Sequence, residues 1–261
     1  MKKLFITYGI GIFAAVIIIG AIPMSQYYTA AVNFIWSKTH LAPVAIFLNP
    51  NDAKLRFAIG NYYFSGGAYD LKKAEASFKK AVEINEKIPG VHYQLARIYF
   101  LEGNFNDAIF EIGKEISLNP NFKKSYYIKG LILGYRGNFD GAIENLKKFQ
   151  SFDSFNWAGW NDLSWAYFQK GDYKNAKNTA EEGLKRAEGN PWLLNSLGVT
   201  LMNLGDKNGA KDAFTEALSA LTAMTPEDWG RAYPGNDPKI YKIGLEKTKE
   251  SIEFNLNLLP P

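Results

Sequence analysis

The sequence of 261 residues contains no cysteine and only two histidines, His40 and His92. A chain without cysteine forms no disulfide, no thiolate metal site and no cysteine nucleophile, and its redox compartment cannot be inferred from the sequence. Neither histidine belongs to a metal-binding spacing such as H-E-x-x-H, and no G-x-S-x-G elbow or P-loop is present. We therefore expect no enzyme activity, no metal and no cofactor.

A strong excess of one charge is also missing. The formal net charge is +4, and it is spread through mixed segments such as residues 72–87. Such a pattern favours solubility and lacks a phosphate-binding stripe, so we expect no nucleic-acid partner. Hydrophobic residues make up 47% of the chain, which is enough to bury a sizeable core.

A long stretch that is uncharged and mostly apolar occupies residues 4–22. These nineteen residues are close in number to the roughly 20 that span a bilayer as a helix. We expect residues 1–24 to be an anchor. A cleaved signal peptide is the alternative, but the run exceeds the roughly 7 to 15 apolar residues usual for one, and no A-x-A-like site follows it at the right distance.

Positive charge is distributed unevenly around this run. Lys2 and Lys3 precede it, and the next basic residue is Lys38. By the positive-inside rule, the chain from about Ser25 onward lies on the far side of the membrane. The expected location is therefore the cytoplasmic (inner) membrane, crossed once, with the rest of the chain on the extracytoplasmic, periplasmic side.

The rest of the sequence repeats with a period of 34 residues. The period is carried by two sets of small residues, Gly103, Gly137, Gly171 and Gly205, and Ala108, Ala142, Ala176 and Ala210. Segments between them have helical periodicity, for example Trp160, Leu163 and Tyr167. The glycines interrupt these segments, so each unit is predicted to be a pair of helices joined by a tight turn.

A helix pair of this length resembles the tetratricopeptide repeat. The residues that carry the resemblance in the fifth unit are Leu194, Leu197, Gly198, Leu201, Ala210, Phe214 and Ala217. Other units depart from the pattern: Lys129 replaces a leucine, Phe149 a small residue and Ala180 an aromatic, and the first unit has two extra residues in its turn.

The resemblance implies an all-α fold in which an N-terminal transmembrane helix is followed by an α-solenoid of about five helix-turn-helix repeats and a C-terminal capping helix. The predicted repeats are residues 53–88, 89–122, 123–156, 157–190 and 191–224. Close approach of the paired helices is attributed to small residues on the first helix that face the alanines of the second, namely Gly60, Ala96, Gly130, Ser164 and Gly198.

Two flanking segments complete the predicted organisation. Residues 25–52 form a membrane-proximal helical segment, interpreted as a degenerate repeat, with an exposed linker as the alternative. Residues 225–261 form a loop and a capping helix, with a docking helix for a partner as the alternative. The face expected to close the solenoid is Tyr241, Leu245, Thr248, Ile252 and Leu259.

In the tetratricopeptide family, the first helix of each pair lines a concave binding surface. Carried onto this sequence, the lining includes Lys54, and the partner-binding residues are Phe57, Asn61, Tyr93, Arg97, Phe100, Lys124, Tyr127, Tyr135, Asn161, Trp165, Phe168, Asn195 and Met202. Asparagine amides pair with both donors and acceptors of an extended backbone, and Tyr, Trp and Arg are common interface anchors. Packing between helices is the alternative role for many of these aromatics.

Some members of the family clamp the terminal carboxylate of a chaperone tail. Asn61 and Lys124 fit that pattern, but Phe57 and Ile128 stand where a clamp lysine and arginine are expected, which argues against it. The acidic residues Glu111 and Glu115 are expected on a solvated face, and His92 is expected in the core.

The leading functional hypothesis is a membrane-anchored adaptor or scaffold that mediates protein–protein interactions and complex assembly on the extracytoplasmic face. Its partner would be an extended segment or a helix in the concave groove. The alternatives are a periplasmic holdase or export accessory that binds extended polypeptides, and a structural subunit of a larger membrane complex. Oligomeric state and partner identity are not encoded in any pattern of this sequence.

Overall fold

The computed structural model describes residues 26–65, 68–232 and 236–260. This part of the chain is helical throughout and contains no strand. Ten helices form five consecutive antiparallel pairs, α4 (Ala53–Ser65) with α5 (Leu71–Ile84), α6 (Val91–Leu101) with α7 (Phe105–Leu118), α8 (Lys123–Tyr135) with α9 (Phe139–Phe152), α10 (Trp157–Gln169) with α11 (Tyr173–Leu184), and α12 (Pro191–Asn203) with α13 (Lys207–Thr222). The fold is an all-α helical repeat array.

A glycine followed by Asn or Asp makes the turn inside four of the five pairs. Gly103, Gly137, Gly171 and Gly205 have φ between 74° and 84°, a conformation that glycine adopts without steric cost. The next residue caps the second helix, because its side-chain oxygen accepts the N–H three residues later. The caps, including that of the first pair, are Asp70, Asn104, Asn138, Asp172 and Asp206, with N···O distances of 2.9 to 3.5 Å.

Small residues on the first helix of a pair allow the second helix to pack closely. A Cβ added to Gly60 would lie 2.5 Å from the ring of Phe78, and one added to Gly198 would lie 2.6 Å from the ring of Phe214. In the fourth pair the first helix carries the larger Ser164 in place of a glycine, and the second helix carries the smaller Ala180 in place of an aromatic. The Ser164 hydroxyl donates a hydrogen bond of 2.9 Å to the Ala176 carbonyl.

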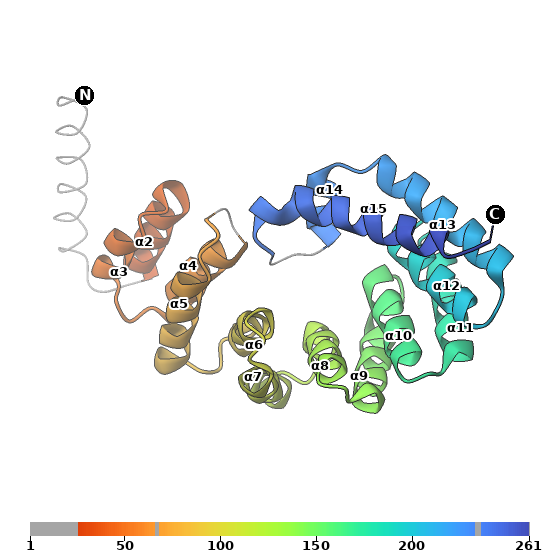
Figure 1. Cartoon of the computed structure of the whole chain (residues 1–261). Coiled ribbons are helices and arrows are strands. Elements are labelled where there is room, and N and C mark those ends of the chain that lie inside the picture. The colour runs from red at the N-terminus through yellow and green to blue at the C-terminus, as the bar shows by residue number, and fades with distance from the viewer. Residues whose placement is uncertain (1–25, 66–67, 233–235, 261) are drawn as a thin grey trace, which may run out of the picture.

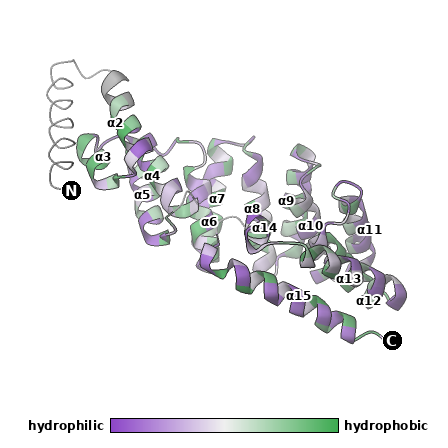
Figure 2. Cartoon of the chain, turned by 90° about the horizontal axis from the view of Figure 1, so that it is seen from above, coloured by the Kyte–Doolittle hydropathy of each residue, from purple (hydrophilic) through white to green (hydrophobic). Residues whose placement is uncertain are grey.

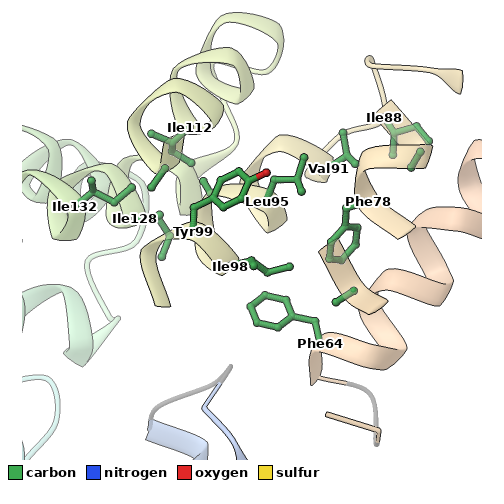
Figure 3. Close-up of a cluster of buried hydrophobic side chains, with 14 of the residues drawn as sticks. Phe64, Phe78, Ile88, Val91, Leu95, Ile98, Tyr99, Ile112, Ile128 and Ile132 are labelled. Atoms are coloured by element: carbon green, nitrogen blue, oxygen red, sulfur yellow. The ribbon is translucent and has the colours of Figure 1, made fainter. Parts of the chain in front are cut away.

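The buried side chains form a core that runs along the array between the helix layers. Figure 3 shows the largest cluster, where Phe64 and Phe78 of the first pair pack with Ile98 of the second, and Ile112 and Ile132 continue the cluster toward α8. Each helix pair is therefore stabilised by its neighbours as well as by its own contacts, as expected of a stacked repeat.

Two short helices precede the pairs, α2 (Gln26–Thr39) and α3 (Ala42–Leu48). Val32, Trp36 and Ala45 are buried against Leu55 and Ile59 of α4. Residues 26–48 therefore pack onto the end of the array and do not form an exposed linker.

The predicted anchor at residues 1–24 falls outside the described residues. Among the helices that the structure describes, none is long and apolar enough to cross a membrane.

The C-terminal segment folds back across the array. It consists of α14 (Pro226–Ala232), a short 3₁₀ turn η1 (Pro238–Ile240) and α15 (Tyr241–Asn257). Thr225 and Asp228 cap α14 reciprocally, with the Asp228 carboxylate accepting the Thr225 N–H at 2.9 Å. Leu245 and Ile252 of α15 are buried against the last pair, and Figure 2 shows hydrophobic and hydrophilic residues alternating along this helix.

The helix pairs follow an arch, and α14 and α15 lie across its open side (Figure 1). The start of α15 reaches the turn between α4 and α5. Burial, and then the neighbouring Asp237 and Tyr241, raise the pKa of Tyr69 in that turn. The last elements of the chain therefore approach the first repeat, and α6, α8, α10 and α12 face the inside of the arch.

The expectation that Glu115 is solvated is wrong. Glu115 is fully buried, and its carboxylate accepts the backbone N–H of Gly90 at 2.9 Å and of Tyr93 at 3.2 Å. The reason is that Gly90, at the start of α6, has no side chain with which to cap the helix, so a carboxylate from α7 satisfies these free amides. Glu111 is also mostly buried, with its carboxylate 2.5 Å from Nδ1 of His92.

We expect Ala142→Leu to lower the melting temperature. Ala142 is fully buried beneath Gly130 and Gly134, and extra methylenes in a filled core cost about 1 to 3 kcal/mol. Thermal unfolding followed by circular dichroism measures the effect, and Glu144→Leu, at an exposed position of the same helix, is the matched control. Equal melting temperatures for the two variants would show that the paired helices are not held in this register.

Candidate functional site

The inner side of the arch carries a continuous groove made of two adjoining pockets. Their volumes are about 380 Å³ and 760 Å³, and they share walls that include Phe100, Tyr127 and Trp157. Ala232 and Asn236 of the C-terminal segment line both pockets. The groove thus lies between the first helices of the repeats and the segment that folds back over them.

Most residues predicted for the concave surface line this groove. Tyr93, Arg97, Phe100, Lys124 and Tyr127 line the smaller pocket. The larger pocket adds Tyr135, Asn161, Trp165 and Asn195. The structure therefore brings together side chains from α6, α8, α10 and α12 that are separated by about one repeat each in the sequence.

Lys54, which is exposed, lies outside the two pockets, and so do four of the partner-binding residues. Phe57 packs against Phe78 with ring centroids 5.6 Å apart. Asn61 accepts a hydrogen bond of 2.5 Å from Gln94. Phe168 packs on Tyr173, and Met202 packs against the C-terminal cluster. Their contacts are those of helix packing, as the alternative interpretation of the sequence proposed.

The contacts of Asn61 bear on the carboxylate clamp. Its amide oxygen is engaged by Gln94, and Ile128, where the clamp arginine is expected, is buried. Lys124 is exposed at the rim of the smaller pocket. Positions 61 and 128 therefore do not supply the free amide and the cation with which that pattern grips a terminal carboxylate.

Asp162 is the most informative residue of the groove, and it is absent from the residues predicted from the sequence. It lies on α10 beside Asn161 and lines the larger pocket. Its Oδ2 accepts a hydrogen bond of 2.5 Å from the Tyr127 hydroxyl, and its Oδ1 accepts one of 3.1 Å from the Asn161 amide. Helical spacing alone could have found it, because Ala158, Asp162 and Trp165 are three or four residues apart and share one face.

The surroundings of Asp162 disfavour its charged form. Burial raises the pKa of Asp162 to about 6, while the hydrogen bonds from Tyr127 and Asn161 act in the opposite direction. Burial and then the Asp162 carboxylate also raise the pKa of the Tyr135 phenol. The hydrogen bonds from Tyr127 and Asn161 therefore offset only part of the desolvation cost of the charged carboxylate.

Aromatic rings make up much of the wall around Asp162. Trp165 lies against Tyr135 with centroids 5.4 Å apart, and it approaches α8 at Gly134, where a Cβ would come within 2.5 Å of the indole. Trp157 and Trp192 stack with centroids 4.9 Å apart. The glycine of one repeat thus positions a tryptophan of the next.

The smaller pocket, at the other end of the groove, is lined by an arginine, Arg97, and by no carboxylate among the described residues. The Arg97 guanidinium lies 4.4 Å from the ring centroid of Phe64 and 5.6 Å from that of Tyr93, and its Nη1 donates to Gln94 at 2.9 Å. Burial lowers the pKa of this guanidinium from its ordinary value. His92, by contrast, is buried within the second pair and lines neither pocket.

The helix pairs, their stacking and the inner groove define a helical-repeat solenoid. A family model described as the tetratricopeptide repeat matches residues 89–122, 158–190 and 193–220. Three of the five helix pairs, the second, fourth and fifth, are thus matched as tetratricopeptide repeats. The pairs at 53–84 and 123–152, outside the matched ranges, are those in which the sequence departs from the pattern by an insertion or by Lys129 and Phe149.

Individual similar proteins carry the same repeats. TPR repeat-containing protein YpiA of Bacillus subtilis (strain 168) is 30% identical over 171 residues, which are 65% of this chain and 40% of YpiA. The chain spans 21% to 40% of the length of the curated relatives that it matches.

Solved structures show the same fold. The crystal structure of YrrB, described as a TPR protein with an unusual peptide-binding site, superposes with a TM-score of 0.57 at 16% identity over 70% of this chain and 93% of YrrB. A MamA chain from Desulfovibrio magneticus RS-1 that starts at residue 41 superposes with a TM-score of 0.59 at 18% identity over 66% of this chain and 96% of the solved one.

Ionisation of Asp162 predicts a specific pH dependence. Because the pKa of this group is raised from 3.8 to about 6 on folding, its contribution to stability falls as the pH rises through that window and stays low above it. Two pKa units correspond to about 3 kcal/mol, which we discount to about 1 kcal/mol because water in the open groove screens the part of the carboxylate that faces it. Relative to the wild type, Asp162→Asn should therefore gain about 1 kcal/mol of stability between pH 4 and pH 7.

Denaturant unfolding of the wild type and of Asp162→Asn across that range measures this difference. Glu144→Gln, which removes one exposed negative charge from the outer helix α9, is the control. Parallel stability curves for the wild type and Asp162→Asn would show that Asp162 is solvated in the folded protein.

Proposed function

We propose that this protein is a membrane-anchored adaptor that holds an extended segment of a protein partner in its concave groove, on the extracytoplasmic side of the membrane. It does no chemistry on the partner. The observation that carries the proposal is the groove itself, a cavity bordered by aromatic and amide side chains from four successive repeats. Proteins of this fold act as scaffolds for other proteins.

The dimensions and chemistry of the groove suit an extended segment. Its two pockets continue into each other past Phe100 and Tyr127, so an occupant would contact several repeats. Asn161 and Asn195 offer amides for backbone hydrogen bonds, and the tyrosines and tryptophans offer rigid apolar area. YrrB, a protein of this fold that is described as having a peptide-binding site, supports the same use of the array.

The location forms the second part of the proposal, and the sequence supports it. Residues 4–22 are uncharged and follow Lys2 and Lys3, the arrangement that anchors a chain with its N-terminus inside. The helices α2 and α3 would then hold the repeats close to the membrane surface. The alternative is a holdase that receives many unrelated polypeptides, because an aromatic groove would also suit that function.

Photo-crosslinking in native membranes tests the groove. We expect p-benzoyl-phenylalanine at Tyr93, Tyr127 or Trp165 to give the same dominant protein adduct by mass spectrometry, since all three side chains line the groove. The same group at Phe110, an exposed aromatic on the outer helix α7, is the control and should not give that adduct.

Other adduct patterns decide between the candidate functions. Many unrelated adducts at the three groove positions, absent at Phe110, would replace the adaptor with a holdase. Adducts that are equal at groove and control positions, or absent from the groove, would contradict binding in the groove.

Fractionation tests the anchor. We expect the full-length protein to sediment with membranes and to remain there in alkaline carbonate, because an apolar helix of this length partitions into the bilayer. Deletion of residues 1–24 should release it to the soluble fraction. Full-length protein that is already soluble, or a repeat domain that is resistant to protease added outside the membrane, would contradict the anchor or its orientation.

A further inference from the structure

Asp162 is a carboxylate of the groove that no cationic side chain of the described residues pairs with. Its two hydrogen bonds, from the Tyr127 hydroxyl and the Asn161 amide, come from neutral groups. Among the described residues, no residue that lines this pocket takes part in an ion pair; the pair of Lys123 with Asp153, for example, lies outside it. Buried charges in proteins are ordinarily paired, so an unpaired one facing a cavity indicates a missing cation.

The pocket also contains further unused hydrogen-bond acceptors. A carboxylate has about four acceptor positions, and each oxygen of Asp162 uses one. The side-chain oxygen of Asn195, which lines the same pocket, is buried and accepts no hydrogen bond among the described residues. If the Asn195 side chain turns toward the pocket, an occupant with several N–H donors would satisfy both groups.

The walls of the pocket suit a cation with a flat or apolar body. Tyr135, Trp157, Trp165 and Trp192 line it together with Asp162. Aromatic faces attract cations within about 6 Å, and arginine in particular stacks on them. The same chain already packs a guanidinium in this way at the other end of the groove, where Arg97 lies over Phe64.

The two arginines that line the groove are engaged elsewhere. Arg97 contacts Phe64, Tyr93 and Gln94, and Arg231 forms an ion pair with Asp228 on its own helix. Both line the smaller pocket, together with Lys124, and not the larger one. The larger pocket therefore has an acidic, aromatic character that is distinct from the rest of the groove.

From this juxtaposition we propose that the Asp162 pocket binds an arginine side chain of the extended partner segment. The carboxylate is the counter-ion, the Asn195 oxygen accepts a further guanidinium N–H, and the tyrosine and tryptophan rings form the walls. The inference rests on the proposed function, because it specifies which residue the partner segment places in the groove. The arginine would enter between α8, α10 and α12.

Selection from a random peptide library displayed on phage tests the preference without a known partner. We expect peptides selected on the full-length protein to contain arginine at one recurrent position. Selection on Asp162→Asn should lose that enrichment, whereas Glu144→Gln, which removes one negative charge from the outer surface, should retain it. Benzophenone at Tyr93 should crosslink the selected peptides and so show that they occupy the groove.

Synthetic peptides provide a second test that needs no variant of the protein. Replacing the recurrent arginine by citrulline keeps the shape of the side chain and removes its charge. We expect this change to weaken binding to the wild type by about 10-fold or more, measured by isothermal titration calorimetry. Binding to Asp162→Asn should respond to the same change by less than about 2-fold.

The outcomes separate this inference from the proposed function. Peptides that crosslink in the groove but show no preference for arginine, or that bind equally well with citrulline, overturn the arginine pocket and leave the groove as a peptide site. A selection that yields no peptide crosslinked in the groove overturns both.

Discussion

The close approach of two helices within each repeat is the constraint on which the rest of the structure depends. Gly60, Gly130 and Gly198 leave space that the side chain of the partner helix fills, with no room for a Cβ. This packing fixes the angle of each pair, and repeating it turns the first helices of successive pairs toward the inside of an arch (Figure 1). The groove is therefore a consequence of small residues that never touch it.

Much of this fold could be predicted because the period of 34 residues is carried by residues with a single physical role. A glycine at positive φ and an Asn or Asp cap recur at four of the five turns, so the all-α repeat class followed from their spacing. The buried carboxylate Glu115 could not be predicted in this way. Glu115 caps α6 only because α7 packs against the start of that helix, and the sequence of neither helix alone specifies this contact.

The repeat period also predicted part of the candidate site. Tyr127, Asn161 and Trp165 line the groove because the repeat register places them on the inner face of their helices. Asp162 lies on that face too, but its importance comes from burial and from the Tyr127 hydroxyl one repeat away. The contribution of Ala232 and Asn236 depends on how the C-terminal segment returns across the arch, and no periodic pattern specifies that path.

The central claim is that the inner face of the array binds partner segments, and the tryptophans report on it directly. Trp157, Trp165, Trp192 and Trp229 line the larger pocket, whereas Trp36 is buried against α4 and the Trp160 indole donates to the Ser154 carbonyl. Titration of the ¹⁵N-tryptophan-labelled full-length protein with a selected arginine peptide should shift the indole NMR signals of the first four residues. The signals of Trp36 and Trp160 should stay in place. Shifts confined to Trp36 and Trp160, or equal at all six tryptophans, would contradict the account.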